Sequence, residues 1–356
     1  MAPLSGDEGT VLEEALPERL DSGEDAALAD PELTLERSVT VVVVTSPAVS
    51  DPSLALLEVS LGSLRNVPGI GKCRFLVVCD GWLEQDADAE WFQAHKGLIP
   101  AARVTAYQER LAALEAAIVA DGSEKSRGGA TCGWVRPHWE VLRLETWHGY
   151  GRALLAGLDQ VQTPLALVLQ HDYAFVRPLE LAPLARAMLR SLARANEGVD
   201  EVAIPLNYIA LLKKAQVNYR SAIRARQGLD IGKAVAFIDG PGDALVSLTR
   251  LPQLYDSPHL ARTQWYRTML REGRYRKRGE GVPRGQFPED VVSEFTLARA
   301  RERGVRAVVE EFGTYLYEGD GQGPTIAHVD GRRFLDVAQR LERGWPACHN
   351  RYTAKN

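Results

Sequence analysis

The sequence has few cysteines, no long hydrophobic run and no signal peptide. Four cysteines stand among 356 residues, at positions 73, 79, 132 and 348, and none has C-x-x-C spacing, so we expect neither a disulfide framework nor a zinc site. No apolar run approaches the roughly 20 residues that span a bilayer, and the N-terminus lacks a basic start followed by an apolar stretch. These absences favour a cytoplasmic protein without a membrane span, although a fragment of a secretory enzyme would look the same.

Motifs of several nucleotide-binding and hydrolytic enzymes are also missing. The sequence contains no G-x-x-x-x-G-K-[ST] phosphate loop and no G-x-S-x-G nucleophile elbow. In GYGRALLAG, residues 149–157, Leu154 occupies the place of the third glycine of a G-x-G-x-x-G fingerprint. No such fingerprint follows the first predicted strand, and the missing elbow argues against an α/β-hydrolase.

Acidic residues are concentrated at the N-terminus. Residues 1–36 contain eleven acidic residues and one basic residue, whereas residues 37–356 contain 36 acidic and 41 basic residues. We therefore predict that residues 1–36 form an acidic, mostly disordered leader. The weak excess of positive charge in the remainder suits an anionic small ligand, and it is too dispersed to indicate a nucleic-acid partner.

The first predicted elements are a strand, a helix and a second strand. Residues 38–45, SVTVVVVT, form a β-branched run typical of a buried parallel strand. Asp51 and Pro52 match the N-cap and first position of a helix that continues to residue 64. Residues 73–79, CRFLVVC, follow as a strand whose two cysteines we expect in the core. This order begins a doubly wound sheet.

The remaining segments extend the pattern into a single domain. No internal repeat or low-complexity linker divides it, so we expect one α/β domain with elaborations over residues 37–335 and a tail over residues 336–356. Further strands are predicted at 140–146, 164–170, 201–206, 234–240, 243–250 and 305–311, and helices at 86–122, 146–158, 180–196, 257–273 and 288–304.

Polar side chains follow three of the predicted strands. Thr45 and Pro47 follow the first, Asp80 follows the second, and His171-Asp172 follows the strand at 164–170. Ligands of open α/β sheets bind at the carboxyl ends of the strands, so these residues are candidates for a binding site. The residues after the first two strands also fit ordinary turns.

Asp172 is the strongest of these candidates. It follows the apolar run LALVLQ and precedes Phe175 and Val176, and a lone carboxylate in such surroundings needs a cation or a hydrogen-bonding partner. Mg²⁺ and Mn²⁺ take oxygen ligands and bridge carboxylates to phosphates. The neighbouring His171 could instead contribute to a nitrogen-rich metal site, and a capped turn at the strand end is the remaining alternative.

The order of these features resembles that of GT-A-fold, nucleotide-sugar-dependent glycosyltransferases, nearest to the large inverting family of processive and non-processive synthases (family 2). The resemblance implies a Rossmann-like mixed sheet flanked by helices. It also implies transfer of a hexosyl or pentosyl group from a UDP- or GDP-sugar to a glycan, protein or small-molecule acceptor. It covers about residues 38–330 and follows the series VTVVVVTSP, FLVVCDG, WHGYGRALLAGL, LALVLQHD, Glu289-Asp290 and His328.

The resemblance assigns a metal site and a catalytic base. In the family an Asp-x-Asp motif ends the strand before the site, and its last Asp binds the metal. Asp172 matches that position, whereas Gln170 replaces the first acid and leaves the strength and identity of metal binding open. His328 matches a histidine that completes the metal shell, so Mn²⁺ or Mg²⁺ is the implied cofactor. Glu289-Asp290 matches the family's Glu-Asp motif, whose Asp is the base, although the helix dipole alone also favours acids there.

A second set of residues is assigned to the donor. Some match positions that hold the nucleobase and ribose, and others match the family's glycine loop, where an arginine could pair with a phosphate. The set is Thr45, Pro47, Asp80, Gly149, Gly151, Arg152 and His171.

Two rival functions stay open beside an inverting, divalent-metal-dependent glycosyltransferase. A sugar nucleotidyltransferase would need a Gly-rich loop with Arg or Lys after the first strand, and TSPAVSDPS, residues 45–53, contains none of these. A catalytically silent nucleotide- or glycan-binding module is favoured by Gln170 in place of an acid. The sequence therefore favours the transferase over both.

Overall fold

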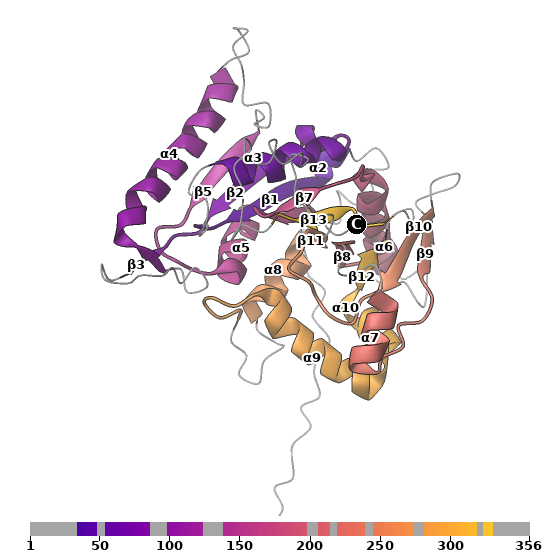
Figure 1. The fold of residues 1–356 in the computed structure, drawn as a ribbon. Coiled ribbons are helices and arrows are strands. Elements are labelled where there is room, and N and C mark those ends of the chain that lie inside the picture. Colours follow the sequence, from indigo (N-terminus) through magenta and orange to yellow (C-terminus); the bar gives the residue numbers. More distant parts are fainter. Residues whose placement is uncertain are drawn as a thin grey trace, which may run out of the picture.

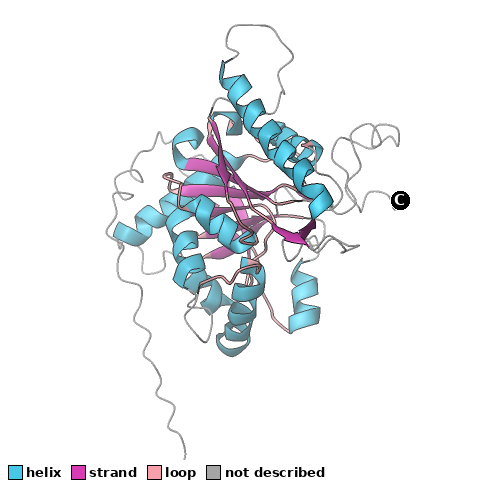
Figure 2. Ribbon diagram, turned by 90° about the vertical axis from the view of Figure 1, so that its left-hand side faces the viewer, coloured by secondary structure: helices cyan, strands magenta, loops and turns pink. Residues whose placement is uncertain are grey.

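The computed structural model is built around a mixed β-sheet with helices on both faces (Figures 1 and 2). Within the described residues, the main sheet has nine strands in the order β5-β2-β1-β6-β11-β8-β12-β10-β9. This confirms the predicted fold class, a mixed α/β sheet flanked by helices. The structure describes residues 34–47, 54–85, 98–123, 138–197, 206–213, 219–238, 245–272, 281–318 and 323–329.

Four neighbouring strands on one side of the sheet run parallel. The valine-rich β1 is buried at every residue, as expected for a parallel strand covered on both faces. Cys73 and Cys79 are buried free thiols at the ends of β2, as predicted. The four strands are β1 (Val39–Thr45), β2 (Arg74–Cys79), β5 (Trp139–Arg143) and β6 (Leu165–Gln170).

The other half of the sheet is mixed. β11 runs antiparallel to both β6 and β8, and it joins the two halves. β12 lies parallel to β8, and β10 lies antiparallel to both β12 and β9. These strands are β8 (Tyr208–Leu211), β9 (Val235–Ile238), β10 (Leu245–Arg250), β11 (His259–Arg262) and β12 (Thr314–Tyr317).

Two short sheets lie outside the main one. β7 (Tyr173–Phe175) pairs antiparallel with β13 (Ile326–His328), and this pairing brings the end of the described chain back to the end of β6. β3 (Leu83–Gln85) pairs in parallel with β4 (Leu98–Pro100) just before α4.

Helices cover both faces of the sheet (Figure 2). α5 packs against β1 and β2, and Gly157 allows the close approach, because a Cβ there would lie 2.6 Å from Cγ2 of Val78. Within the described ranges, no helix combines the length and apolar character needed to cross a bilayer. The helices are α2 (Leu35–Ser38), α3 (Ala55–Gly62), α4 (Ala101–Ser123), α5 (Tyr150–Leu158), α6 (Leu181–Glu197), α7 (Tyr219–Gln227), α8 (Thr263–Glu272), α9 (Pro288–Arg303) and α10 (Val305–Phe312), with 3₁₀ turns at Ser63–Asn66 and Ile70–Lys72.

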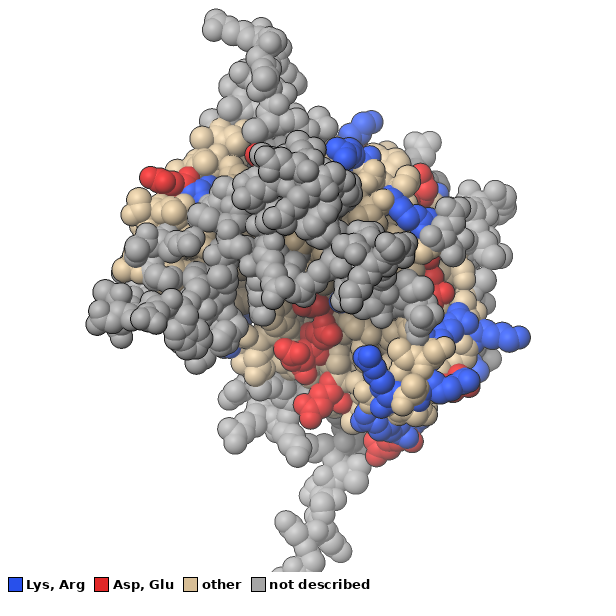
Figure 3. Space-filling model, viewed as in Figure 1, with Lys and Arg blue, Asp and Glu red and all other residues tan. Residues whose placement is uncertain are grey.

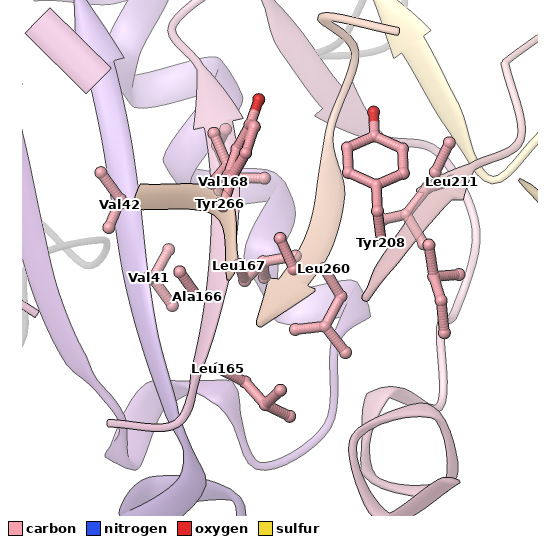
Figure 4. Close-up of a cluster of buried hydrophobic side chains, with 14 of the residues drawn as sticks. Val41, Val42, Leu165, Ala166, Leu167, Val168, Tyr208, Leu211, Leu260 and Tyr266 are labelled. Atoms are coloured by element: carbon pink, nitrogen blue, oxygen red, sulfur yellow. The ribbon is translucent and has the colours of Figure 1, made fainter. Parts of the chain in front are cut away.

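One large hydrophobic core runs through both halves of the sheet. Figure 4 shows its centre, where side chains of β1, β6, β8, β11 and α8 lie together. Leu260 of β11 is fully buried and is paired in register with Leu167 of β6 and Ile209 of β8. The core is therefore continuous across the two halves of the sheet.

Several predicted elements are wrong or shifted. Residues 305–311 form a helix and not a strand, because the buried residues of α10 recur with helical spacing. The predicted helix at 257–273 begins only at Thr263, since residues 259–262 form β11. The predicted helix at 86–122 begins at Ala101 within the described residues. The cap at Asp51-Pro52, most of the predicted strand at 201–206, residues 1–33 of the predicted leader, and the tail lie outside the described residues.

Candidate functional site

The carboxyl ends of β1, β2 and β6 meet at one edge of the sheet. Thr45 is paired in register with Cys79, and Val44 with Gln170. Just beyond the strands, the amide of Asp80 donates to the carbonyl of Thr45 at 2.8 Å. The amide of His171 donates to the carbonyl of Val44 at 3.2 Å. The polar residues that follow the three strands are thus neighbours in space.

Asp172 and His328 form a contact across 156 positions of sequence. The Nε2 atom of His328 lies 3.0 Å from Oδ2 of Asp172. The β7–β13 pairing sets this geometry, because it places His328 opposite Tyr173, and the two rings meet edge to face at 4.9 Å. The amide of Val329 also donates to the carbonyl of Asp172 at 2.6 Å. The structure therefore brings together the two residues predicted to hold a metal.

The Asp172 carboxylate is only partly satisfied by the chain. Its side chain is 18% exposed, and Oδ1 is buried without a hydrogen-bond partner among the described residues. Burial alone would raise the pKa of Asp172, but the hydrogen bond from His328 and the charges of His171 and His328 outweigh it and lower the pKa. Asp172 is therefore an anion with one buried oxygen that has no hydrogen-bond partner among the described residues.

The side chain of His171 is engaged with the end of β1. Its Nδ1 atom accepts a long hydrogen bond from the amide of Ser46, at 3.4 Å. Burial lowers the pKa of His171 to about 4, and the charge of Asp172 opposes this shift only in part. The imidazole is consequently neutral at physiological pH, so it positions the end of β1 and offers no positive charge to a phosphate.

A narrow pocket lies beside this edge, between β1, β2 and α4. The buried Arg110 donates to the Oγ1 atom of Thr45 at 2.9 Å and to the carbonyl of Ser46 at 3.2 Å. Trp82 and Tyr107 add aromatic walls, with ring centroids 6.4 Å apart. The pocket is lined by Thr45, Ser46, Pro47, Cys79, Asp80, Trp82, Tyr107, Arg110 and Leu111.

Sequence reasoning missed Arg110, Tyr107 and Trp82. The signal that could have found Arg110 is its place among apolar residues at helical spacing, next to Leu111 and three positions after Tyr107. An arginine on the buried face of an amphipathic helix needs acceptors, and here the end of β1 provides them.

The carboxylate of Asp80 accepts two backbone amides, and the sequence did not indicate these contacts. Its Oδ1 atom accepts the amide of His148 at 2.8 Å, and its Oδ2 atom accepts the amide of Gly149 at 2.9 Å. Burial raises the pKa of Asp80, and these two amides oppose the shift. Asp80 therefore lines the pocket while it holds the loop that precedes α5.

Gly149 and Arg152 face the loop before α9 and not the Asp172–His328 pair. Gly149 has φ of +77°, and a Cβ there would lie 2.4 Å from Cα of Gly285. The Nε atom of Arg152 donates to the carbonyl of Val282 at 3.1 Å. Arg152 lines a separate groove with His148 and other residues of α5, α8 and the loop at 281–283. Neither residue contacts Asp172.

Glu289 and Asp290 occupy the first turn of α9, but their surroundings differ. The Oε2 atom of Glu289 accepts the amide of Asp256 at 3.0 Å, and the carbonyl of Asp256 accepts Nε2 of Gln170 at 2.7 Å. These bonds tie the start of α9 to the end of β6. Asp290 is exposed, and acidic side chains gather over α9 at the centre of the face shown in Figure 3.

The pKa of the Glu289 carboxyl group is unusually high. Burial raises its pKa to about 7, and the neighbouring Asp256 carboxyl adds to the shift. The nearby ammonium of Lys213 opposes it. Glu289 is thus partly protonated near neutral pH.

The Asp172–His328 pair fits a divalent cation that takes its other ligands from elsewhere. The buried Oδ1 atom of Asp172 needs a partner. Adjacent ligands of an octahedral ion at about 2.1 Å lie about 3.0 Å apart, as do Oδ2 of Asp172 and Nε2 of His328. The described ranges contain no group of three or more His, Cys, Asp or Glu side chains that could hold a metal. Phosphate oxygens and water are the ligands that such ions commonly add.

Comparisons by sequence find no relative. No protein-family model matches the chain, and no curated protein matches it.

Solved structures with a similar fold include glycosyltransferases. TarS 1-349 of S. aureus in complex with UDP-GlcNAc has 13% identity and a TM-score of 0.36, over 81% of this chain and 57% of that one. The mannosyltransferase PcManGT of Pyrobaculum calidifontis in complex with GDP-Man and Mn²⁺ has 12% identity and a TM-score of 0.38, over 88% and 62%. A Bacillus anthracis protein described as a glucose-1-phosphate thymidylyltransferase has 11% identity and a TM-score of 0.37, over 86% and 93%.

Glycosyltransferases are thus among the solved structures that the chain resembles at low TM-score. The chain spans about 57–62% of the first two proteins that it matches. At these TM-scores the likeness assigns neither a function nor roles for single residues.

Proposed function

We propose that this protein is a glycosyltransferase that moves a sugar from a nucleoside-diphosphate donor to an acceptor hydroxyl. The observation that carries the proposal is the Asp172–His328 pair, which lies at the carboxyl edge of the parallel strands with one carboxylate oxygen unsatisfied. A donor diphosphate held there through Mn²⁺ or Mg²⁺ would satisfy that oxygen. The Arg110 pocket beside the pair supports a place for the nucleoside.

Trp82 is the side chain at this pocket on which a nucleobase could stack, because it is half-buried whereas Tyr107 is buried behind it. Thr45 and Pro47 line the same pocket at the end of β1. Arg110 fixes this end of β1 through its two hydrogen bonds. UDP- and GDP-sugars are the donors to test first.

The proposed chemistry is a direct displacement with inversion. The acceptor oxygen bonds to the anomeric carbon as the bond from that carbon to the diphosphate oxygen breaks, and the electron pair stays on the diphosphate. Asp290, exposed in the first turn of α9, takes the proton of the acceptor hydroxyl. Glu289 positions Asp290 by tying the helix start to Asp256. When bound, the cation neutralises charge on the departing diphosphate.

The test is turnover of a panel of UDP- and GDP-sugars with Mn²⁺ and a panel of glycan, peptide and small-molecule acceptors, read by mass spectrometry. We expect Asp172→Asn to reduce transfer by roughly 100-fold or more, since it removes the charge that holds the cation. Asp230→Asn is the matched control, because Asp230 is exposed and forms its ion pair with the exposed Arg224. Equal transfer by wild type and Asp172→Asn would contradict the assigned site.

A binding module without catalysis is the second candidate. The observation that favours it is Gln170, whose amide is engaged with the carbonyl of Asp256 where the resembling family has an acid. Thermal shifts with UDP or GDP, with and without Mn²⁺, measure binding separately from turnover. Cation-dependent stabilisation with no transfer from any donor would support the module, and release of pyrophosphate from a nucleoside triphosphate and a sugar phosphate would indicate a nucleotidyltransferase.

A cytoplasmic location also stays a prediction.

A further inference from the structure

Lys213 lies where the two parts of the candidate site meet. Its ammonium is 4.0 Å from Oδ1 of Asp256 and faces the rings of Tyr173 and Tyr255, at 5.8 and 5.1 Å from their centroids. Its side chain is only 19% exposed. We propose that Lys213 binds the diphosphate of the donor and stabilises it as a leaving group, an inference that rests on the proposed function.

Two sets of contacts connect Lys213 to the Asp172–His328 pair through intermediate residues. The first runs through Tyr173, whose ring contacts that of His328 at 4.9 Å, and the backbone of Lys213 also bridges to Ile326 of β13. The second runs through Asp256, whose carbonyl accepts the side chain of Gln170, two residues before Asp172. The ammonium therefore lies at the same edge of the sheet as the Asp172–His328 pair.

The charge balance of this edge calls for a cation. A diphosphate at this edge would approach the carboxyl groups of Asp172 and Asp256. Two other cations among the described residues already donate to the chain: Arg110 to the end of β1, and Arg152 to the carbonyl of Val282. A lysine ammonium carries three donors, so Lys213 can keep Asp256 as a neighbour while it donates to phosphate oxygens.

The limited exposure of Lys213 strengthens this role. An ammonium in a poorly solvated position attracts an anion more strongly than one in open water. As the bond from the anomeric carbon to the diphosphate oxygen breaks, negative charge grows on that oxygen. An N–H of Lys213 stabilises the charge without transferring its proton, and the acceptor's proton goes to Asp290.

The experiment compares binding of UDP, GDP and the nucleosides uridine and guanosine by calorimetry, with Mn²⁺ present. We expect Lys213→Met to weaken binding of the preferred diphosphate by about 10-fold or more, since a hydrogen bond between charged groups is lost. Binding of the matching nucleoside, which has no phosphate, should not change. Lys213→Arg should keep most of the affinity, and Lys233→Met is the matched control, because Lys233 is exposed near β9.

The outcomes separate the role of Lys213 from the proposed function. If wild type binds the diphosphate and Lys213→Met binds it equally well, the role of Lys213 is overturned while the proposed function stands. If wild type binds neither UDP nor GDP, the proposed function fails, and this inference fails with it. Should Lys213→Met lose its fold by circular dichroism, Lys213→Gln keeps a hydrogen-bonding group beside Asp256, and wild-type affinity in that variant would overturn the inference.

Discussion

At the scale of single residues, two adjacent acids on α9 have different environments. Glu289 accepts a backbone amide and titrates near pH 7, whereas Asp290 is exposed. The helix start alone would favour Glu289 as an anion, so its raised pKa comes from burial and, after that, from its contacts with Asp256. We therefore assign them different roles, Asp290 as the base and Glu289 as a positioning residue.

We expect Asp290→Asn to lower kcat by roughly 10²–10⁴-fold, the usual contribution of a general base, while the Kd for the nucleoside diphosphate stays unchanged. Glu289→Gln should cost much less, because the amide oxygen can still accept from Asp256. Steady-state kinetics and calorimetry on both variants check this. A kcat of Asp290→Asn close to that of wild type would remove Asp290 from the mechanism.

The raised pKa of Glu289 predicts a pH dependence of stability. The folded state holds the proton up to about pH 7, whereas the unfolded state releases it near 4.5. Between these values the folded state binds more protons, so this group's contribution to the free energy of unfolding falls as pH rises and is constant above the window. Glu289→Gln cannot ionise, so its stability relative to wild type should increase from about pH 5 to about pH 8.

Urea unfolding at several pH values measures this difference. Glu294→Gln is the control for loss of a carboxyl group on the same helix, because Glu294 is exposed. A Glu289→Gln difference that does not vary with pH would show that the Glu289–Asp256 contact does not hold a proton.

At the scale of elements, the start of α5 and the loop before α9 pack backbone against backbone. Gly149 lies against Gly285, and a Cβ on Gly285 would in turn lie 2.6 Å from the Trp147 ring. Asp80 holds the same loop through two amides. The residues that the sequence analysis assigned to a donor loop thus join β2, α5 and the segment that leads to the candidate base.

We expect Gly149→Ala to lower the free energy of unfolding by about 3 kcal/mol or more, because it combines a strained backbone with a clash against fixed backbone atoms. Gly228→Ala is the matched control. Gly228 also has a positive φ, of +67°, but nothing lies within 4 Å of its Cβ position, so its cost should be about 1–2 kcal/mol. Equal costs in urea unfolding would contradict the packing argument.

The sequence predicted elements well where a local pattern dictates them. The β-branched run of β1 and the helix boundary signals of α9 have local causes, and both elements appear within one or two residues of their expected bounds. The sequence did not predict β11, because its four residues pair with β6 and β8, which are distant in sequence. Arg110 was missed for the same reason, since its acceptors lie more than 60 positions away. Non-local pairing leaves little trace in a short window of sequence.

At the scale of the whole molecule, β11 connects the parallel half of the sheet to the mixed half. The candidate site depends on this connection, because Asp172 follows β6 in one half, whereas Lys213 and His328 come from segments next to the other half. The core is continuous across β11. Loss of packing at this strand should therefore destabilise both halves of the sheet.

We expect Leu260→Ala to lower the free energy of unfolding by about 2–5 kcal/mol, the usual cost of a cavity at a fully buried leucine. Hydrogen exchange should show the same loss for the slowest amides of β1 and β2 as for those of β12, if the two halves open as one unit. Val246→Ala on β10, near the edge of the sheet, is the comparison and should affect the distant β1–β2 amides less. A loss confined to one half in Leu260→Ala would mean that the halves unfold separately, and the site would then be assembled only when both are docked.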